Sequence, residues 1–357
     1  MTIYIIYIVM LLKNGIIGDN MHSKRYIKPY AFLLLIIFII SAVLISGCAE
    51  TETQTEQQLT SLTFGYQPST HQIAYLTAKD QGWWNESLSP LGVQSTSDRL
   101  FPTGAPEMSA MLAGEIDVAY VGAAPVVAAI ASGLDAKIVA AAQIQGSDIV
   151  LRNDLPYEGP EDLKGLRIGT FPPGTIQDTL LREWLADNDI NPDTDVTILP
   201  MGPGDAVTAL SAGQVDAVFL PHPSPTEIEV QGIGRSVVQS GEMKKDHACC
   251  VVAVSGRLIR EHPDVVQQIV ATHARAIQYD NENVDEAAAV FAADQDWDVQ
   301  VVEKSLADWD GTWVADPAVI VNSTVDYARV QYEQGTINRQ LTQDDLFDLS
   351  FYEALDQ

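Results

Sequence analysis

The 357-residue chain has 20 Lys and Arg against 48 Asp and Glu, which gives a formal net charge of −28 at pH 7. Residues 1–47 hold four of the basic residues and one Asp, so the rest of the chain has 16 basic and 47 acidic residues and a net charge of −31. This charge excludes nucleic acid as a partner, because phosphate binding needs a basic surface. The acidic residues are scattered, and we interpret them as a halophilic adaptation that keeps the protein soluble at high salt.

The N-terminal region has the pattern of an export signal. An apolar run over residues 31–45, AFLLLIIFIISAVLI, is short for a membrane span. Basic residues precede this run, and Ser46-Gly47-Cys48 follows it, as in a signal peptide. The segment resembles a lipoprotein signal, in which Cys48 is the lipidated residue; the alternative is an uncleaved membrane anchor. Both place the protein outside the cytoplasmic membrane and tethered to it.

We therefore assign residues 1–47 to the signal peptide, with Met21 as an alternative start, and residues 48–60 to a polar, acidic spacer. The first lobe should begin with a short strand over Leu62–Tyr66 and a loop over 67–72. A helix ended by Gly82 follows this loop. In the loop, Ser69 and Thr70 can cap the helix or offer hydroxyls to a ligand. The neighbouring side chains, His71 and Gln72, are further candidate ligand contacts.

A repeated pattern predicts two similar α/β lobes. Residues 111–125, MLAGEIDVAYVGAAP, read as a helix end at Gly114, a strand over Ile116–Val121 and a turn. Residues 210–220, LSAGQVDAVFL, repeat the first eleven positions in chemical type. Because ligands of open α/β sheets bind outside the carboxyl ends of strands, two such units predict one ligand between two lobes.

The turn after the first copy begins a helix without a polar cap. Gly122, Ala123 and Ala124 precede Pro125, which suits the first turn of a helix. No Ser, Thr, Asp or Asn is present to accept from the first N–H groups, so another partner must do so. A bound anion or another ligand oxygen fits this role, and water is the alternative.

The second lobe repeats the order of the first. After a strand over Lys137–Ala142, the chain passes Gly146 and Ser147 and crosses over. We assign the first lobe to residues 61–150 and 254–357 and the second to residues 151–253. Gly174 and Thr175 begin a helix in the second lobe, where Thr175 and Asp178 form a variant of the capping box.

The second copy of the repeat ends at His222 between two prolines, so this side chain is held stiffly. It either faces the ligand or lies at the surface or in a lid. Cys249 and Cys250 lie in an apolar run over 248–254 that predicts a buried strand. We interpret them as two core thiols; the alternative is a strained disulfide. The sequence contains no metal-ligand spacing and no nucleophile or phosphate-binding motif, so we expect a binding protein without metal or cofactor rather than an enzyme.

Several motifs in combination resemble the extracytoplasmic solute-binding proteins of ABC importers, of the aliphatic-sulfonate, taurine and nitrate type. They are GYQPST over residues 65–70, LAGEIDVAYVGAAP over 112–125, LKGLRIG over 163–169, GTIQD over 174–178 and LSAGQVD over 210–216. The resemblance implies the α/β type II periplasmic-binding-protein fold, in which two crossing strands form a hinge. It also implies a monomer that passes its solute to the permease subunits of an importer.

The resemblance further implies which residues contact the solute. These are Ser69, Thr70, His71, Gln72, Gly122, Ala123, Ala124, Gly146, Ser147, Gly174 and Thr175; His222 is a further candidate from its own position at a strand end. The bound group in this family is often an oxyanion, here expected to be a sulfonate or taurine-like head. Pro221-His222-Pro223 replaces a Trp-containing segment of nitrate-type members, which argues against nitrate.

Three alternatives remain open at this stage. One is an enzyme on the same fold that acts in pyrimidine or thiamine-precursor metabolism; related pyrimidine synthases carry a cysteine-rich motif that Cys249-Cys250 does not reproduce. Another is the binding of a neutral heterocycle that stacks on Tyr66 or Tyr120. The third is a sensor domain of a membrane receptor.

Overall fold

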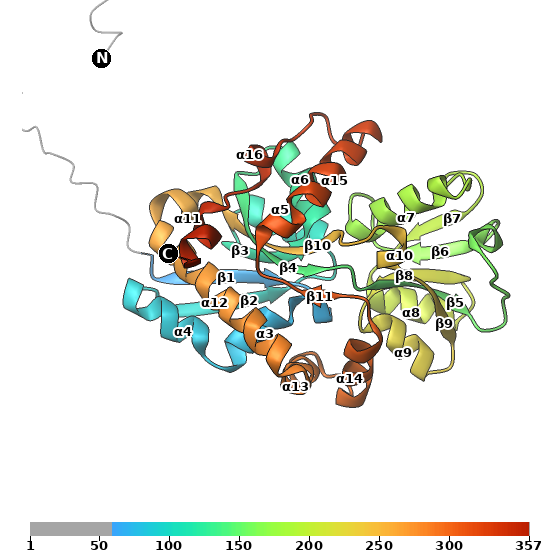
Figure 1. Cartoon of the computed structure of the whole chain (residues 1–357), viewed down its shortest axis with the longest axis horizontal. Helices are drawn as coiled ribbons and strands as arrows, with labels where there is room; N and C mark the ends of the chain where they lie inside the picture. The colour runs from blue at the N-terminus through green and yellow to red at the C-terminus, as the bar shows by residue number, and fades with distance from the viewer. Residues whose placement is uncertain (1–58, 357) are drawn as a thin grey trace, which may run out of the picture. The chain divides into compact units, whose positions relative to one another are not determined.

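Two β-sheets organise the part of the chain that the computed structural model describes, residues 59–356 (Figure 1). The predicted signal peptide, Cys48 and nearly all of the predicted spacer lie outside these residues. The described residues belong to one compact unit of the chain. Within them, no helix is both long and apolar enough to cross a membrane.

The first sheet has six strands in the order β11-β4-β10-β3-β1-β2. The strands are β1 (Ser61–Tyr66), β2 (Ser95–Leu100), β3 (Val118–Gly122), β4 (Ala136–Ile144), β10 (Ala248–Ser255) and β11 (Thr312–Trp313). Strand β1 is parallel to β2 and β3, whereas β10 is antiparallel to both of its neighbours, β3 and β4. The antiparallel pairing brings the start of β10 beside the end of β3, where Cys250 pairs with Gly122.

The second sheet has five strands in the order β7-β6-β8-β5-β9. They are β5 (Ser147–Arg152), β6 (Arg167–Thr170), β7 (Thr197–Pro200), β8 (Ala217–Pro221) and β9 (Gly234–Gln239). Strand β6 is parallel to β7 and β8, and β5 is antiparallel to β8, so the inner strands repeat the arrangement of β1, β2, β3 and β10. The expectation of two similar α/β lobes is confirmed.

Equivalent residues end a helix and join two strands in both lobes. Gly114 and Gly213 end their helices with φ of 72° and 65°, a left-handed conformation that glycine adopts at little cost. Asp117 Oδ2 then accepts a hydrogen bond of 3.0 Å from the backbone of Thr63, and Asp216 Oδ2 accepts one of 3.0 Å from the backbone of Arg167. Each Asp thus ties the start of one strand to its parallel neighbour.

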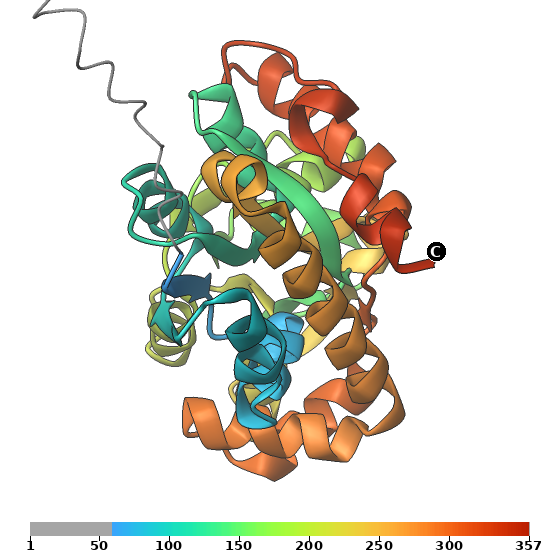
Figure 2. The ribbon, with the colours of Figure 1, turned by 90° about the vertical axis from the view of Figure 1, so that its left-hand side faces the viewer.

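Helices cover the faces of both sheets. Those whose sequence lies next to the first sheet are α3 (Ile73–Asp80), α4 (Trp83–Leu88), α5 (Gly104–Leu112), α6 (Ala123–Ala131), α11 (Gly256–Glu261), α12 (Pro263–Glu282), α13 (Val284–Gln295), α14 (Val299–Asp308), α15 (Val321–Glu333), α16 (Gln343–Leu346) and α17 (Ser350–Glu353). Those of the second lobe are α7 (Ile176–Asp187), α8 (Pro203–Ser211), α9 (Ser224–Val230) and α10 (Ser240–Met243). Figure 2 shows α12, in orange, running along the first lobe, where it contacts α3 and α4. Short 3₁₀ segments, among them η1 (Thr70–Gln72) and η4 (Pro317–Ile320), connect these elements.

The chain crosses between the sheets at two places. It leaves β4 at Ile144 and enters β5 at Ser147, and it returns between α10 and the first residue of β10, Ala248. The predicted boundaries at 150/151 and 253/254 therefore lie inside β5 and β10, each of which pairs wholly within one sheet. The assignment of residues 254–357 to the first lobe does not mean that their helices contact only that lobe. Helix α14 contacts α9, and α15 contacts both α6 and α7.

Each lobe has its own apolar core. Trp83 and Trp84 are buried in the core of the first lobe, as expected for packing residues. Two clusters cover the two faces of the second sheet, one around Phe219 and one around Val218. Ile176, the first residue of α7, belongs instead to the core of the first lobe. The start of α7 therefore inserts into the opposite lobe.

Candidate binding site between the lobes

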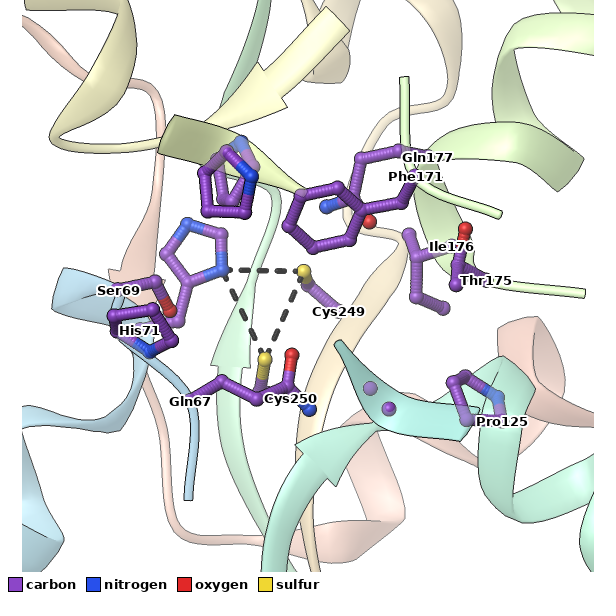
Figure 3. Close-up of a pocket in the computed structure, with 15 residues that line it drawn as sticks. Gln67, Ser69, His71, Pro125, Phe171, Thr175, Ile176, Gln177, Cys249 and Cys250 are labelled. Atoms are coloured by element: carbon purple, nitrogen blue, oxygen red, sulfur yellow. Dashed lines mark hydrogen bonds between the residues drawn. The ribbon is translucent and has the colours of Figure 1, made fainter. Parts of the chain in front are cut away.

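A cavity of about 20 Å³ lies between the lobes, at the carboxyl ends of β1, β3, β6 and β8 (Figure 3). This volume is about that of one water molecule. The residues that line it are Gln67, Pro68, Ser69, His71, Gly104, Gly122, Pro125, Phe171, Thr175, Ile176, Gln177, Pro203, Pro221, Cys249 and Cys250. The two repeated strands, β3 and β8, thus both end at this cavity, as the sequence predicted.

The starts of helical segments from both lobes meet at this cavity. Helix α6 follows Gly122, and no side chain caps it. Helix α7 follows Thr175, whose hydroxyl accepts from the backbone N–H of Asp178 at 3.3 Å, so the predicted cap is present. Each helix N-terminus carries roughly half a positive charge. Among the lining residues there is no Lys or Arg, so these helix ends are the main source of positive potential.

Two hydroxyls at the cavity differ in their freedom to bind a solute. Thr175 Oγ1 donates to the carbonyl of Pro172 at 2.8 Å while it caps α7, so its single proton is engaged. Ser69 lies at the end of the loop after β1 and is 5 % exposed. Within the described part of the chain its hydroxyl makes no hydrogen bond, and no side chain caps η1. Ser69 is therefore the hydroxyl able to donate into the cavity.

The predicted contact residues divide into those that line the cavity and those that support it. Ser69, His71, Gly122 and Thr175 line it. The other eight do not, and they are Thr70, Gln72, Ala123, Ala124, Gly146, Ser147, Gly174 and His222. Most of these eight have their polar groups engaged within the protein. Gln72 Oε1, for example, accepts from the backbone N–H of Gln67 at 2.5 Å.

Thr70 and His222 join the two lobes behind the cavity. The backbone N–H and the hydroxyl of Thr70 both donate to the carbonyl of His222, each at 3.1 Å. The His222 ring is buried away from the cavity, with Nδ1 2.8 Å from Ser305 Oγ and Nε2 3.3 Å from Asp148 Oδ1. This position is neither of the two expected for His222, because the side chain does not line the cavity and is buried rather than at the surface; it makes an interlobe contact instead.

Gly146 and Ser147 belong to the first crossing between the sheets. The carbonyl of Gly146 accepts from the backbone N–H of His222 at 3.1 Å, and the N–H of Gly146 donates to Asp310 Oδ1 at 2.8 Å. Ser147 Oγ accepts from Gln177 Nε2 at 3.1 Å. These residues hold the hinge and orient Gln177, which itself lines the cavity.

Several lining residues were not expected from the sequence. Gln67 and Gln177 bring amides to the cavity, and Phe171 brings an aromatic ring. Gln67 Nε2 donates to Glu107 Oε2 at 2.7 Å. Burial raises the pKa of the Glu107 carboxyl well above its usual value, which the hydrogen bond from Gln67 opposes. A neutral Glu107 adds no negative charge beside the cavity. For Gln177, the only indication in the sequence was its place in the first turn of the helix that starts at Ile176.

Cys249 and Cys250 also line the cavity, and both are free thiols, as the core-thiol interpretation predicted. Their sulfurs lie 3.3 Å and 3.8 Å from Nδ1 of His71, so these residues could hold a metal ion. No spacing along the chain signals this cluster, because His71 precedes Cys249 by 178 residues. Only the antiparallel placement of β10 brings them together.

An apolar groove adjoins the cavity. It has a volume of about 250 Å³ and runs between α5, α6 and the turn before α7. Pro125 and Thr175 line both spaces, so the groove opens beside the cavity. Its other residues include the apolar side chains of Ala105, Met108, Leu112, Ala128, Ala129 and Leu134.

The family model described as NMT1-like matches residues 55–293, more than half of the chain. The chain belongs to the NMT1-like family. A relative from Bacillus subtilis carries the name "Putative aliphatic sulfonates-binding protein". It is 26 % identical over 320 residues, which cover 89 % of this chain and 95 % of the relative. The resemblance to solute-binding proteins of the sulfonate and nitrate type is confirmed.

Solved structures show the same fold. The alkanesulfonate-binding protein SsuA of Xanthomonas axonopodis, bound to MOPS, has a TM-score of 0.72 at 22 % identity and covers 81 % of this chain and 99 % of its own. The nitrate-binding protein NrtA of Synechocystis has a TM-score of 0.73 at 15 % identity and covers 83 % of this chain and 88 % of its own. The fold is thus the expected two-lobed α/β fold of type II periplasmic binding proteins.

The same fold also occurs in an enzyme. A variant of DszB in complex with biphenyl-2-sulfinic acid has a TM-score of 0.61 at 17 % identity and covers 83 % of this chain and 99 % of its own. The fold alone therefore does not separate a binding protein from an enzyme.

Proposed function

We propose that this protein is the extracytoplasmic solute-binding component of an ABC importer, and that it closes its lobes on an aliphatic sulfonate. The observation that carries the proposal is the uncapped start of α6 at Gly122, which faces the cavity beside the free Ser69 hydroxyl. Backbone N–H groups at a helix start favour an oxyanion. The family and its sulfonate-binding relative support the same class of solute.

The groove beside the cavity supports a solute with an apolar tail. A sulfonate head at the start of α6 would leave its carbon chain near Pro125 and Thr175, which line both spaces. From there the apolar wall of Met108, Leu112 and Ala128 continues outward. Inorganic nitrate has no part that would use this groove.

The positions of two tyrosines do not support a solute held by ring stacking. Tyr66 directs its hydroxyl to Asp294 Oδ2 at 3.2 Å, and Tyr120 lies with its hydroxyl 3.1 Å from Nδ1 of His273. Neither residue lines the cavity. We therefore prefer the sulfonate to the neutral heterocycle.

Solute entry requires the lobes to separate, because a space of about 20 Å³ is smaller than a sulfonate group. The contacts that must break include the two hydrogen bonds from Thr70 to His222. They also include the hydrogen bond of 3.3 Å that Gln331 Nε2 donates across the lobes to the carbonyl of Gly174, while the same group donates to Ala124 of its own lobe at 3.2 Å. Each is a neutral hydrogen bond whose net contribution is about 1 kcal/mol, and Ile176 at the start of α7 must also leave the core of the first lobe.

The experiment is isothermal titration calorimetry of the purified chain with a panel of alkanesulfonates, taurine, a sulfate ester, nitrate and an uncharged heterocycle. We expect the sulfonates to bind at about 1 μM or tighter, roughly −8 kcal/mol. Recovery of the unchanged sulfonate after denaturation of the complex would separate binding from catalysis. The proposal fails if only the heterocycle binds, or if the sulfonate is converted.

A further inference from the structure

A triad of buried side chains forms one wall of the cavity and has no role in the solute proposal. His71 comes from η1, whereas Cys249 and Cys250 come from the start of β10. Their exposed fractions are 2 %, 1 % and 4 %. Figure 3 shows both sulfurs and the imidazole directed toward one another.

The three ligand atoms have the spacing of a metal site. Nδ1 of His71 lies 3.3 Å from Sγ of Cys249 and 3.8 Å from Sγ of Cys250, and the two sulfurs lie 4.0 Å apart. A zinc ion about 2.3 Å from each sulfur and about 2.0 Å from the nitrogen would separate the sulfurs by about 3.8–4.0 Å, and each sulfur from the nitrogen by about 3.5–3.7 Å. The triad therefore needs shifts of only a few tenths of an ångström to bind an ion.

The imidazole is held in the tautomer that a metal ligand requires. Nε2 of His71 lies 2.7 Å from the carbonyl oxygen of Gly146, which can only accept, so Nε2 carries the proton. Nδ1 then presents its lone pair to the two sulfurs. Metal-binding histidines commonly donate their second N–H to a carbonyl or carboxylate in this way. The N–H of His222 donates to the same carbonyl and fixes its position.

The environment of Cys250 favours a thiolate ligand. The hydrogen bond between the two thiols lowers the pKa of Cys250 and raises that of Cys249, and burial raises both. The amide of Gln72 lies 3.8 Å from the same sulfur and donates to it. A thiolate is the form in which cysteine binds metals.

We propose that His71, Cys249 and Cys250 bind one thiophilic metal ion, either Cu(I) or Zn(II). Two thiolates and one imidazole suit both ions. Binding would displace the remaining thiol protons to solvent and needs no oxidant or reductant. Because all three residues line the cavity, the remaining coordination position of the ion would open into it.

The test uses the full chain, reduced, stripped of metal and kept free of oxygen. Cu(I) and Zn(II) are titrated separately against chromophoric chelators, and native mass spectrometry counts the bound ions. We expect one equivalent of at least one of the two ions. X-ray absorption of the loaded protein should show two sulfur neighbours at about 2.3 Å and a nitrogen neighbour at about 2.0 Å.

Matched variants identify the ligands. Cys249→Ser, Cys250→Ser and His71→Ala should each weaken binding at least about a hundredfold. His262→Ala, at the start of α12 and outside the cavity wall, should bind as the wild type does. Circular dichroism of each metal-free variant checks that it folds. If a variant does not fold, the X-ray absorption spectrum of the wild type still tests the proposed ligands.

Either of two results would overturn the metal site. One is the absence of stoichiometric binding of both ions by the reduced wild type. The other is a bound ion without sulfur neighbours, or one whose affinity is unchanged in Cys250→Ser. Neither result bears on sulfonate binding, which is measured separately with the metal-free protein.

Discussion

At the scale of single residues, the cavity contrasts two hydroxyls that the sequence could not separate. Ser69 has a free proton at the cavity, whereas Thr175 uses its proton on Pro172 and its lone pair on the N–H of Asp178. Removing a hydroxyl that donates to the solute should lower affinity, whereas removing a hydroxyl that caps a helix should lower the stability of the fold. The pair therefore tests whether solute recognition or helix capping sets the role of each.

We expect Ser69→Ala to weaken sulfonate binding by about 1–2 kcal/mol, the order of one hydrogen bond to a charged group, with little change in stability. Thr175→Ala should instead lower the free energy of unfolding by about 1 kcal/mol through loss of the cap, and Thr175→Ser should restore it. Calorimetry and denaturant unfolding measure the two effects. Equal losses of affinity without loss of stability in Thr175→Ala would contradict the assignment.

Two buried histidines make the fold sensitive to acid. Burial lowers the pKa of His247 to about 4 and that of His273 to about 4, from an ordinary value near 6.5. The unfolded chain therefore binds more protons between these values, and these residues cost stability as the pH falls from about 6.5 to 4. Burial raises the pKa of Asp280 to about 7, which acts in the opposite direction: its contribution is present at low pH and is lost as the pH rises through about 7.

Burial also raises the pKa of Glu107, so two carboxyls act against the two histidines, and removing one histidine isolates its contribution. Compared with the wild type, His273→Gln should gain free energy of unfolding at pH 4 relative to pH 6.5, because a group that takes up a proton only on unfolding is removed. Chemical denaturation across this range measures the slope for both proteins. A slope that is unchanged in His273→Gln would show that other groups set the acid sensitivity.

At the scale of elements, α6 serves two functions along its length. Gly122, which precedes it, and Pro125 in its first turn line the cavity, while Ala128 and Ala129 further along line the apolar groove. The small side chains of this helix leave room for a solute tail as well as for close approach to the backbone. The same helix would thus contact both the head and the tail of one solute.

Affinity for linear alkanesulfonates should therefore rise with chain length. Each methylene buried in the groove contributes up to about 0.8 kcal/mol, or a factor of about four in Kd. Ala128→Asp should remove this dependence by placing a charge in the groove, and Ala128→Val should leave it in place. The measurement is calorimetry with a homologous series; equal affinities across the series in the wild type would place the tail elsewhere.

At the scale of the whole molecule, contacts across the lobes decide whether the cleft is open or closed. The hydrogen bonds from Thr70 to His222 and from Gln331 to Gly174 cross the lobes and form when they close around the cavity. Neither set involves a group that the solute proposal places on the sulfonate. Closure can thus be weakened without removing a solute contact.

Small-angle scattering should show a smaller radius of gyration with saturating sulfonate than without it. Gln331→Ala should shift the solute-free protein toward the larger radius and reduce affinity, since part of the binding energy must then close the lobes. Asn322→Ala, on the same helix but outside these contacts, is the control. An unchanged profile with solute binding confirmed by calorimetry would contradict a hinge.

The net charge of −31 outside residues 1–47 gives a further whole-molecule expectation. A strongly acidic surface repels an anion from a distance, and salt screens this repulsion over a few ångströms at about 1 M. Contacts inside the closed cavity are screened much less. Sulfonate affinity should hold steady or rise between about 0.1 and 1 M KCl, as measured by calorimetry; a steep fall would indicate that exposed cations bind the head.

Local patterns in the sequence determined the two lobes. The repeat around Gly114 and Gly213 predicted equivalent helix ends and strands because glycine, short apolar runs and aspartate act through their immediate neighbours. The uncapped start of α6 and the cap at Thr175 were predicted for the same reason. The family resemblance then supplied how two such lobes are joined.

Only the tertiary structure decided which side chains meet at the cavity. Gly146, Ser147 and His222 were expected at the solute, yet their polar groups are engaged between the lobes, where the chain crosses from β4 into β5. His71 and Cys249 are 178 residues apart, and the antiparallel pairing of β10 with β3 places them in contact. Distances of this kind depend on strand order and direction, which no local pattern records.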